Sequence, residues 1–112
     1  TYELALDLPL SNMNVYCATA LPGSPLYLQN KKEKKYVSEK YSEFAFLSYD
    51  HIPNSTETLS AKEILAFRDK FFHDYFTNHK ILSNLEKKFG TECVKNINKM
   101  TSIKIKRKLL EE

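Results

Sequence analysis

The chain has 112 residues, of which 42% are hydrophobic and 28% charged, and its formal net charge is +3. This composition excludes a disordered polypeptide, and the length is less than half of the roughly 250 residues of a complete eight-stranded β/α barrel. No run approaches the roughly 20 apolar residues of a membrane span, so we expect no membrane partner. Cys17 and Cys93 form no C-x-x-C motif, so we favour reduced thiols in a cytoplasmic protein over the alternative of a disulfide.

The first part of the chain, residues 1–30, is predicted to form a helix–strand–helix unit. Apolar side chains recur on one side of residues 2–8, which predicts a short helix. A buried strand is predicted over residues 14–19 and ends at a Pro-Gly turn. Ser24 and Pro25 then have the residue types of an N-cap and a first helical position, so a second short helix begins there.

The middle part, residues 31–58, begins with a lysine-rich run and shows no regular period. Its many aromatic residues suggest an extended connector that covers other surfaces. His51 lies in this loop, where functional residues tend to collect. We favour its interpretation as an ordinary loop histidine.

The last part, residues 59–112, is predicted to be a three-helix subdomain. Ser60 and Glu63 form a capping box at the start of the first helix. The apolar positions of the third helix continue through Leu109. The N-caps of the three helices are predicted at Ser60, Asn78 and Thr91. The fold class is therefore expected to be mainly α.

Candidate groups for metal chemistry are few. Asp69 and His73 lie four residues apart on one predicted helix, and a small metalloenzyme using His73 and His79 is one hypothesis. A metal site needs three or four ligands, and the sequence has no second ligand cluster. We therefore favour surface pairing and predict no metal-binding residue.

Two basic features have alternative interpretations. Arg68 lies in an apolar helical stripe and is either an anion clamp or a structural ion-pair partner of Asp50 or Glu43. We favour the structural ion pair. The segment KIKRKLL, residues 104–110, could contact phosphate, but lysines also complement a helix C-terminus. We expect no nucleic-acid partner. A helical interaction module that binds an acidic partner or nucleic acid through its basic third helix is the alternative function.

The sequence resembles the C-terminal region of cobalamin-binding-domain radical S-adenosylmethionine (SAM) proteins. In that family a last barrel strand runs into a Pro-Gly-Ser/Thr turn, followed by an LSxxEVLxFRDxAFxxYF helix, a KFG corner and a basic LKRKLL end. The resemblance covers nearly the whole chain. The matching stretches, in order, are NVYCATALPGSPLY, YSEFAFLSYDHIPNSTETLSAKEILAFRDKFFHDYF, LEKKFG and INKMTSIKIKRKLL.

This resemblance implies a remnant of the last β/α unit of a radical SAM barrel followed by the three-helix subdomain. The parent enzymes use a [4Fe-4S] cluster on a CxxxCxxC loop, SAM and cobalamin, and carry out methyl transfer or ring formation; relatives include anaerobic magnesium-protoporphyrin ester cyclases. The chain contains neither the cluster loop nor the Asp-x-His-x-x-Gly cobalamin motif. We therefore expect a noncatalytic C-terminal fragment of a longer iron–sulfur enzyme, with no catalytic residue and no cofactor bound by the fragment.

The resemblance also implies where the fragment meets the parent enzyme. The expected partner is the remainder of the barrel, and a strand at residues 14–19 without neighbours is expected to self-associate. The loop at residues 49–51 is expected to close over the barrel mouth. The residues implied to lie at that mouth, and so near the cofactor, are Ala18, Thr19, Ala20 and Leu21.

Overall fold

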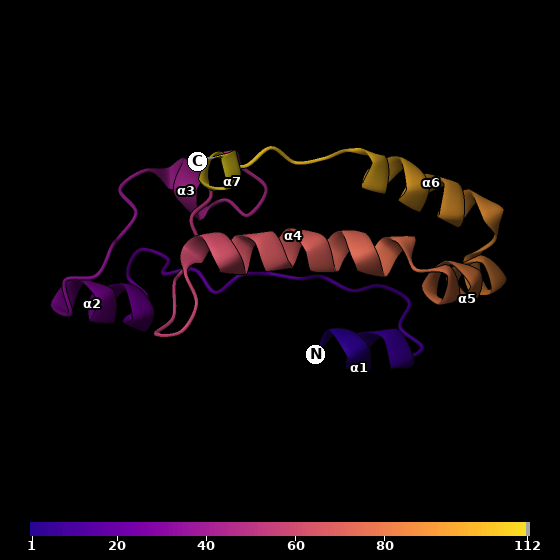
Figure 1. The fold of residues 1–112 in the computed structure, drawn as a ribbon, viewed down its shortest axis with the longest axis horizontal. Coiled ribbons are helices and arrows are strands. Elements are labelled where there is room, and N and C mark those ends of the chain that lie inside the picture. The colour runs from indigo at the N-terminus through magenta and orange to yellow at the C-terminus, as the bar shows by residue number, and fades with distance from the viewer. Residues whose placement is uncertain (112) are drawn as a thin grey trace. The chain divides into compact units, whose positions relative to one another are not determined.

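A computed structural model describes residues 1–111 and contains, within them, seven helices and no strand (Figure 1). The prediction of a mainly α protein is therefore confirmed. The helices are α1 (Tyr2–Asp7), α2 (Pro25–Lys32), α3 (Tyr41–Phe44), α4 (Ala61–Thr77), α5 (His79–Phe89), α6 (Thr91–Ser102) and α7 (Lys108–Glu111).

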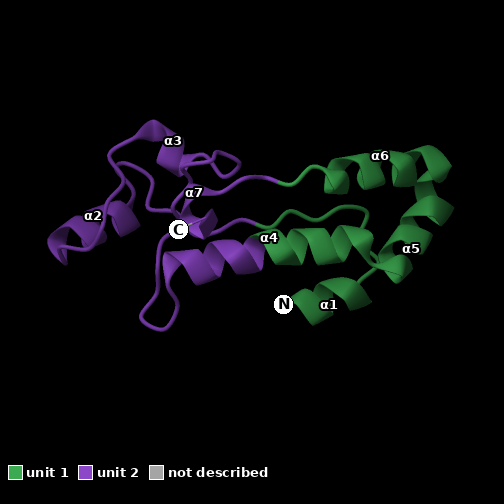
Figure 2. Ribbon diagram, turned by 45° about the horizontal axis from the view of Figure 1, so that its top comes forward, with its two compact units in different colours: residues 1–15, 69–104 green, residues 16–68, 105–112 purple. Residues whose placement is uncertain are grey.

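The chain divides into two compact units, and each combines segments that are distant in the sequence (Figure 2). Unit 1 contains residues 1–15 and 69–104. Unit 2 contains residues 16–68 and the C-terminal residues from 105 onward. The boundary falls within α4, so the first half of this helix belongs to unit 2 and its second half to unit 1.

Unit 1 has an aromatic core made by helices from both of its segments. The ring of Tyr2 on α1 meets the ring of Phe71 on α4 edge-on, with centroids 5.0 Å apart. Rings in this arrangement contribute about 0.5–1.5 kcal/mol beyond the area they bury. The buried residues of this core are Ala5, Phe71, Tyr75, Phe76, Ile81 and Leu85.

The strand predicted over residues 14–19 does not form. This segment belongs to no strand, although Tyr16 and Ala18 are exposed and Cys17 between them is buried, as in a strand. A β-strand requires a neighbour to complete its backbone hydrogen bonds, and residues 1–111 provide no strand at all. The prediction of a buried strand is therefore wrong both in the strand and in the burial, because Tyr16 is 62% exposed.

The short helix α2 begins where it was predicted. The Ser24 hydroxyl oxygen accepts a hydrogen bond from the Tyr27 amide at 3.2 Å, and Pro25 occupies the first helical position. The helix ends at Lys32, within the lysine-rich run. The Ser24 side-chain cap and the proline at the first position explain why this eight-residue helix begins at Pro25.

The capping box of α4 is also confirmed. The Ser60 amide donates to Glu63 Oε2 at 2.8 Å, and the Glu63 amide donates to the Ser60 hydroxyl at 3.2 Å. These reciprocal bonds satisfy two backbone groups that the first turn of a helix leaves unpaired.

The caps around α5 agree with the sequence only in part. Asn78 Oδ1 accepts hydrogen bonds from the amides of Lys80 and Ile81, which confirms Asn78 as the N-cap. Gly90 ends α5 with φ at 88°, in the region that favours glycine. The same glycine is the N-cap of α6, so the prediction of Thr91 as that cap is wrong.

The third long helix is shorter than predicted, because α6 ends at Ser102 and not near Leu109. The Ser102 hydroxyl donates to the carbonyl oxygen of Lys99 at 2.6 Å, a bond that competes with the continuation of the helix. The following Ile-Lys-Ile-Lys run, residues 103–106, alternates with the period of extended chain. Residues 104–107, which supply much of the basic charge of the predicted third helix, are therefore not helical.

Candidate functional site

The residues implied to lie at a barrel mouth belong to the start of unit 2. The Ala18 side chain is exposed, and its carbonyl oxygen accepts a hydrogen bond from the Asn54 amide at 2.8 Å. The Thr19 hydroxyl donates to the carbonyl oxygen of Cys17 at 3.2 Å, and Leu21 is 48% exposed. This segment is thereby fixed to the loop that carries Asn54, although it is not part of a sheet.

Two of these residues, Thr19 and Ala20, line a small hollow of about 20 Å³. The hollow adjoins a larger cavity of about 240 Å³ and shares several wall residues with it. We take the larger cavity as the candidate ligand site. Its lining residues are Asn30, Lys35, Tyr36, Ile52, Pro53, Asn54, Ser55 and Ala61.

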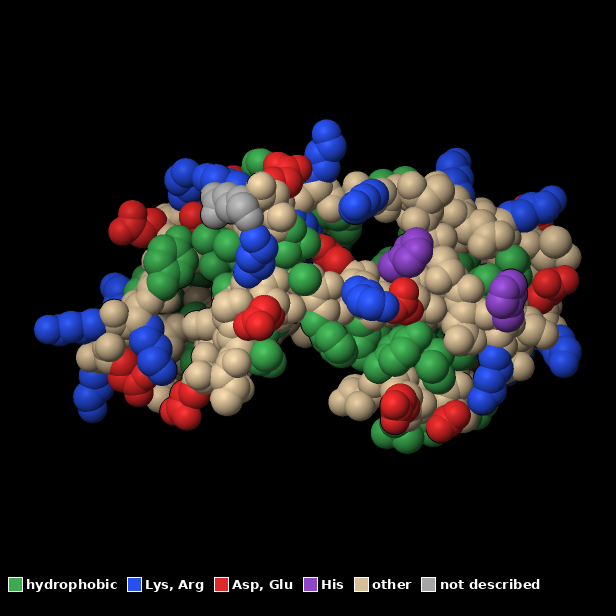
Figure 3. All heavy atoms as spheres, in the orientation of Figure 1, with side chains coloured by type: hydrophobic (Ala, Val, Ile, Leu, Met, Phe, Trp, Pro, Cys, Tyr) green, Lys and Arg blue, Asp and Glu red, His purple; other side chains and the backbone are tan. Residues whose placement is uncertain are grey.

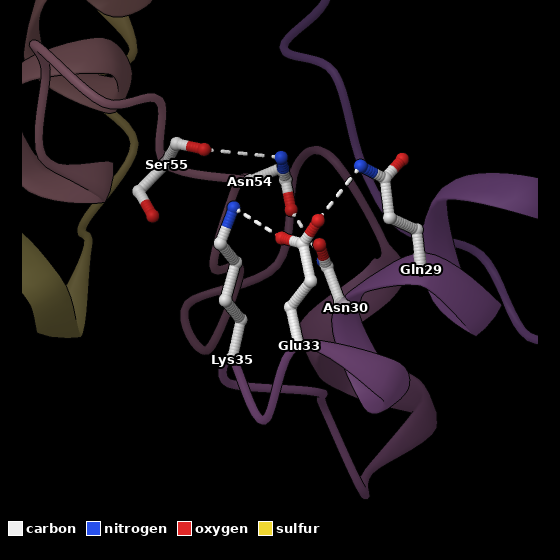
Figure 4. Close-up of polar contacts among 6 residues, drawn as sticks. All are labelled: Gln29, Asn30, Glu33, Lys35, Asn54 and Ser55. Atoms are coloured by element: carbon white, nitrogen blue, oxygen red, sulfur yellow. Dashed lines mark hydrogen bonds and ion pairs between the residues drawn. The ribbon is translucent and has the colours of Figure 1, made fainter.

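Two asparagines contribute bonded amide groups to the polar part of this cavity (Figure 4). Asn30, in the last turn of α2, is 3% exposed, and its Nδ2 donates to Asn54 Oδ1 at 2.7 Å. Asn54 Nδ2 donates in turn to the carbonyl oxygen of Ser55 at 3.1 Å. The amide groups therefore hold each other in place at one side of a mostly apolar space.

Charged side chains near the cavity are paired with each other. Lys35 Nζ lies 2.7 Å from Glu33 Oε2, and Gln29 Nε2 donates to Glu33 Oε1 at 3.1 Å (Figure 4). The hydrogen bond from Lys35, followed by that from Gln29, lowers the pKa of Glu33, and the bond with Glu33 raises the pKa of Lys35. At neutral pH these two charges cancel, so the pair adds no net charge beside the cavity.

The end of α2 directs the chain toward this cavity. The Lys35 amide donates to the carbonyl oxygen of Asn30 at 2.8 Å, and the Lys34 amide donates to that of Lys31 at 3.2 Å. These two bonds define a Schellman motif, with Lys34 in the left-handed conformation at φ 57°. The turn places Lys35 and Tyr36 directly after the helix, where both line the cavity.

His51 is a structural residue of unit 2. It is 1% exposed, and its Nδ1 lies 2.9 Å from the carbonyl oxygen of Glu43. Because a carbonyl oxygen only accepts, Nδ1 carries the proton of this hydrogen bond. The Phe46 ring packs on the imidazole edge with centroids 5.4 Å apart. The interpretation of His51 as a loop histidine agrees with this geometry, with the refinement that it is buried.

Arg107 is the residue that the sequence reasoning misplaced. The basic segment was expected to be a helical surface, but the Arg107 side chain is 2% exposed. Its Nη1 donates to the carbonyl oxygens of Phe46 at 2.6 Å and Ser48 at 3.0 Å. The signal in the sequence was one arginine among lysines, because a planar guanidinium can bind two fixed carbonyls and an ammonium cannot do so as well.

The remaining basic side chains form no concentrated surface on the visible face. The view in Figure 3 shows Lys and Arg side chains distributed widely, with acidic side chains between them. Of the C-terminal segment, Lys104, Lys106 and Lys108 are exposed. Three spaced lysines without an aromatic platform are weak support for nucleic-acid binding.

The candidate metal ligands are not brought together. Within the described residues, no group of three or more His, Cys, Asp or Glu side chains has a geometry that holds a metal ion. His73 and His79 are both exposed, so the metalloenzyme hypothesis gains no support.

Arg68 is half-buried on α4, and its pairing with Asp50 or Glu43 stays a prediction. Both carboxylates have hydroxyl donors of their own. Asp50 Oδ2 accepts a hydrogen bond from the Ser42 hydroxyl at 3.1 Å, and Glu43 Oε2 accepts one from the Tyr36 hydroxyl at 2.8 Å.

Comparison of the chain with protein families, with curated proteins and with solved structures finds no match in any of the three. Among residues 1–111, none of the helices has both the length and the apolar character that crossing a bilayer requires.

Proposed function

We propose that this chain is the noncatalytic C-terminal part of a radical SAM enzyme, a cobalamin-dependent iron–sulfur protein that carries out methyl transfer or cyclase-type radical chemistry. The order and spacing of the four matching stretches, from NVYCATALPGSPLY to INKMTSIKIKRKLL, support this assignment. The proposed partner of the chain is the remainder of the parent barrel.

The observation that carries the proposal is an exposed apolar segment in a chain that has no described strand. Tyr16 is 62% exposed and Leu21 48%, although the segment alternates as a strand does. The strands of a parallel barrel are covered on both faces and paired on both edges. A final barrel strand separated from its neighbours is expected to have this character.

The donor groups of this chain do not fit the cofactors of the parent. A [4Fe-4S] cluster on a CxxxCxxC loop needs three thiolates, and the chain has two cysteines in unrelated contexts. The cobalamin motif Asp-x-His-x-x-Gly is not matched around His51, because Asp50 directly precedes the histidine and Asn54 stands where the motif has its glycine. The proposal therefore assigns the cluster, SAM and cobalamin to the remainder of the parent, and no chemical step to this chain.

What the proposal assigns to this chain is a short stretch of the barrel mouth, Ala18 to Leu21. Small side chains there would let backbone groups approach the adenosyl moiety or the substrate closely. The exposure of Ala18 and Leu21 supports this role, because a large ligand or a neighbouring strand would cover them.

The first test is the reading frame upstream of Thr1. We expect it to encode a CxxxCxxC loop, and the full-length protein to bind iron and to cleave SAM reductively to 5′-deoxyadenosine. A start codon immediately before Thr1 would contradict the proposal, as would SAM cleavage by the 112-residue chain alone.

A second test asks whether Ala18 lies at the barrel mouth of the full-length enzyme. Replacing Ala18 by tryptophan is expected to reduce SAM cleavage at least tenfold, because an indole ring would fill the space above the cofactor. Ala66→Trp is the matched control, since Ala66 is exposed on α4 and remote in sequence from the mouth. Equal activity of the two variants would reject the assignment of Ala18.

A further inference from the structure

The cavity beside α2 has the size and walls of a site for a small ring. Its volume of about 240 Å³ is below the roughly 300–1,000 Å³ of sites for drug-sized ligands, which restricts the occupant to one or two fused rings. Tyr36, Ile52 and Pro53 form apolar walls, and Pro53 is buried. An aromatic ring in the wall favours a planar occupant that can stack on it.

The polar side of the cavity includes the side-chain amide of Asn30, which can form further hydrogen bonds. An asparagine side chain has two N–H donors and a carbonyl acceptor. Within residues 1–111, the side chain of Asn30 makes one hydrogen bond, from Nδ2 to Asn54 Oδ1. The second N–H and the amide oxygen of this 3% exposed residue are therefore available to a ligand that enters the cavity.

The charges near the cavity argue against an anionic ligand. Lys35 is the cation among the lining residues, and its Nζ lies 2.7 Å from the Glu33 carboxylate. A phosphate would have to replace this carboxylate or lie beside it. The site is therefore matched to a neutral ligand.

From these three features we infer that the cavity binds a neutral planar heterocycle with an N–H donor next to a carbonyl or ring-nitrogen acceptor on one edge, as in a free nucleobase. The Asn30 amide pairs with this edge through one N–H and its oxygen, in the two-bond arrangement that asparagine makes with adenine. The Tyr36 ring covers one face. This inference is independent of the proposed function.

The test uses the 112-residue chain labelled with ¹⁵N and titrated with uracil, followed by amide NMR spectra. We expect shifts at the side-chain amides of Asn30 and Asn54 and at the backbone amide of Tyr36. The matched control ligand is 1,3-dimethyluracil, which keeps the ring and both carbonyls but has no N–H, and we expect it to bind at least about tenfold more weakly. Uridine 5′-monophosphate should bind no more tightly than uracil.

Substitutions test whether a loss of uracil binding comes from a missing ligand contact or from unfolding of the chain. Asn30→Ala should weaken uracil binding about tenfold, but the residue is buried and the variant risks unfolding. Tyr36 is 61% exposed, so Tyr36→Ala tests the site without that risk and should also cost about tenfold. Tyr36→Phe keeps the ring and should bind as the wild type does.

Three results would overturn the inference. The first is the same affinity for uracil and dimethyluracil, and the second is the absence of shifts at Asn30 and Tyr36. The third is a phosphate-dependent gain in affinity, which would identify an anion site at Lys35 instead.

Discussion

Lys34 has a backbone conformation that favours glycine, with φ at 57°. A side chain in this left-handed region costs roughly 1–2 kcal/mol because its Cβ crowds the following carbonyl oxygen. The Schellman bonds of the Lys34 and Lys35 amides keep it there. The same bonds direct Tyr36 toward the candidate cavity, so a strained residue positions the site.

We predict that Lys34→Gly stabilises the protein by about 1 kcal/mol, because glycine adopts this conformation without the steric cost. Lys34→Ala is the control, since alanine keeps a Cβ and should give little change. The free energy of unfolding in urea measures both variants. A Gly variant less stable than the Ala variant would show that the lysine side chain itself stabilises the turn.

Tyr75 is a core residue whose hydroxyl group is expected to lower the stability of the protein. It is 1% exposed, and within the described residues its hydroxyl has no hydrogen-bond partner. Burial also raises the pKa of this phenol. A buried hydroxyl without a partner costs about 1–3 kcal/mol.

Tyr75→Phe is therefore expected to stabilise the protein by about 1 kcal/mol, since it removes the unpaired hydroxyl and keeps the ring on Phe76. Thermal unfolding followed by circular dichroism measures the change. Tyr75→Ala, which removes the ring as well, should destabilise by about 3–5 kcal/mol. A destabilised Phe variant would mean that the hydroxyl has a partner in solution.

At the level of elements, helix starts were predicted well because their determinants are local. The Ser60–Glu63 capping box and the Asn78 cap each lie within three residues of the groups they bond. The strand at residues 14–19 and the end of α6 could not be predicted in the same way. The first depends on whether a neighbouring strand exists, and the second depends, beside the local Ser102 bond, on bonds that fix the residues after Ser102 elsewhere in the fold.

The capping box of α4 predicts a dependence of stability on pH. The hydrogen bonds from the Ser60 amide and then the Ser60 hydroxyl lower the pKa of Glu63 below its ordinary value of 4.5. A carboxylate with a lowered pKa in the folded state stabilises that state above its unfolded pKa. This stabilisation is lost as the pH falls from about 4.5 through the folded pKa.

Glu63→Gln keeps an acceptor for the Ser60 amide but does not titrate. We therefore expect wild type to be more stable than Glu63→Gln at pH 7, and this difference to vanish near pH 3. Urea unfolding at both pH values measures it. Ser60→Ala removes the other half of the box and should cost about 1 kcal/mol at pH 7. A difference that persists at low pH would exclude the carboxylate charge as its cause.

At the scale of the whole molecule, each unit is closed by residues far apart in the chain. In unit 1, Lys88 Nζ donates to the carbonyl oxygen of Pro9 at 3.1 Å. In unit 2, Arg107 bonds the carbonyls of Phe46 and Ser48. Helical periodicity gives no information on such pairs. The candidate cavity was not predicted from the sequence: Thr19 and Ala20, named there for an implied barrel mouth, line only the small adjoining hollow, and no pattern placed Asn30 beside Asn54.

The C-terminal segment of unit 2 is fixed by several bonds around Arg107. The Lys108 amide donates to the carbonyl oxygen of Tyr49 at 3.0 Å, and the Tyr49 hydroxyl donates to Glu111 Oε2 at 2.8 Å. The central contribution comes from the Arg107 guanidinium, because hydrogen bonds from a charged donor contribute about 1.5–3 kcal/mol each.

Arg107→Ala is predicted to destabilise the protein by about 3 kcal/mol, since it leaves the carbonyls of Phe46 and Ser48 without this donor. Arg107→Lys should recover only part of the loss, because one ammonium cannot reproduce the guanidinium geometry. Lys106→Ala is the control: its side chain is exposed, so the change should stay within about 0.5 kcal/mol. Urea unfolding measures the energies, and hydrogen exchange at the Lys108 amide reports whether the segment detaches. If Arg107→Ala and Lys106→Ala unfold alike, Arg107 belongs to the solvated basic surface that the sequence first indicated.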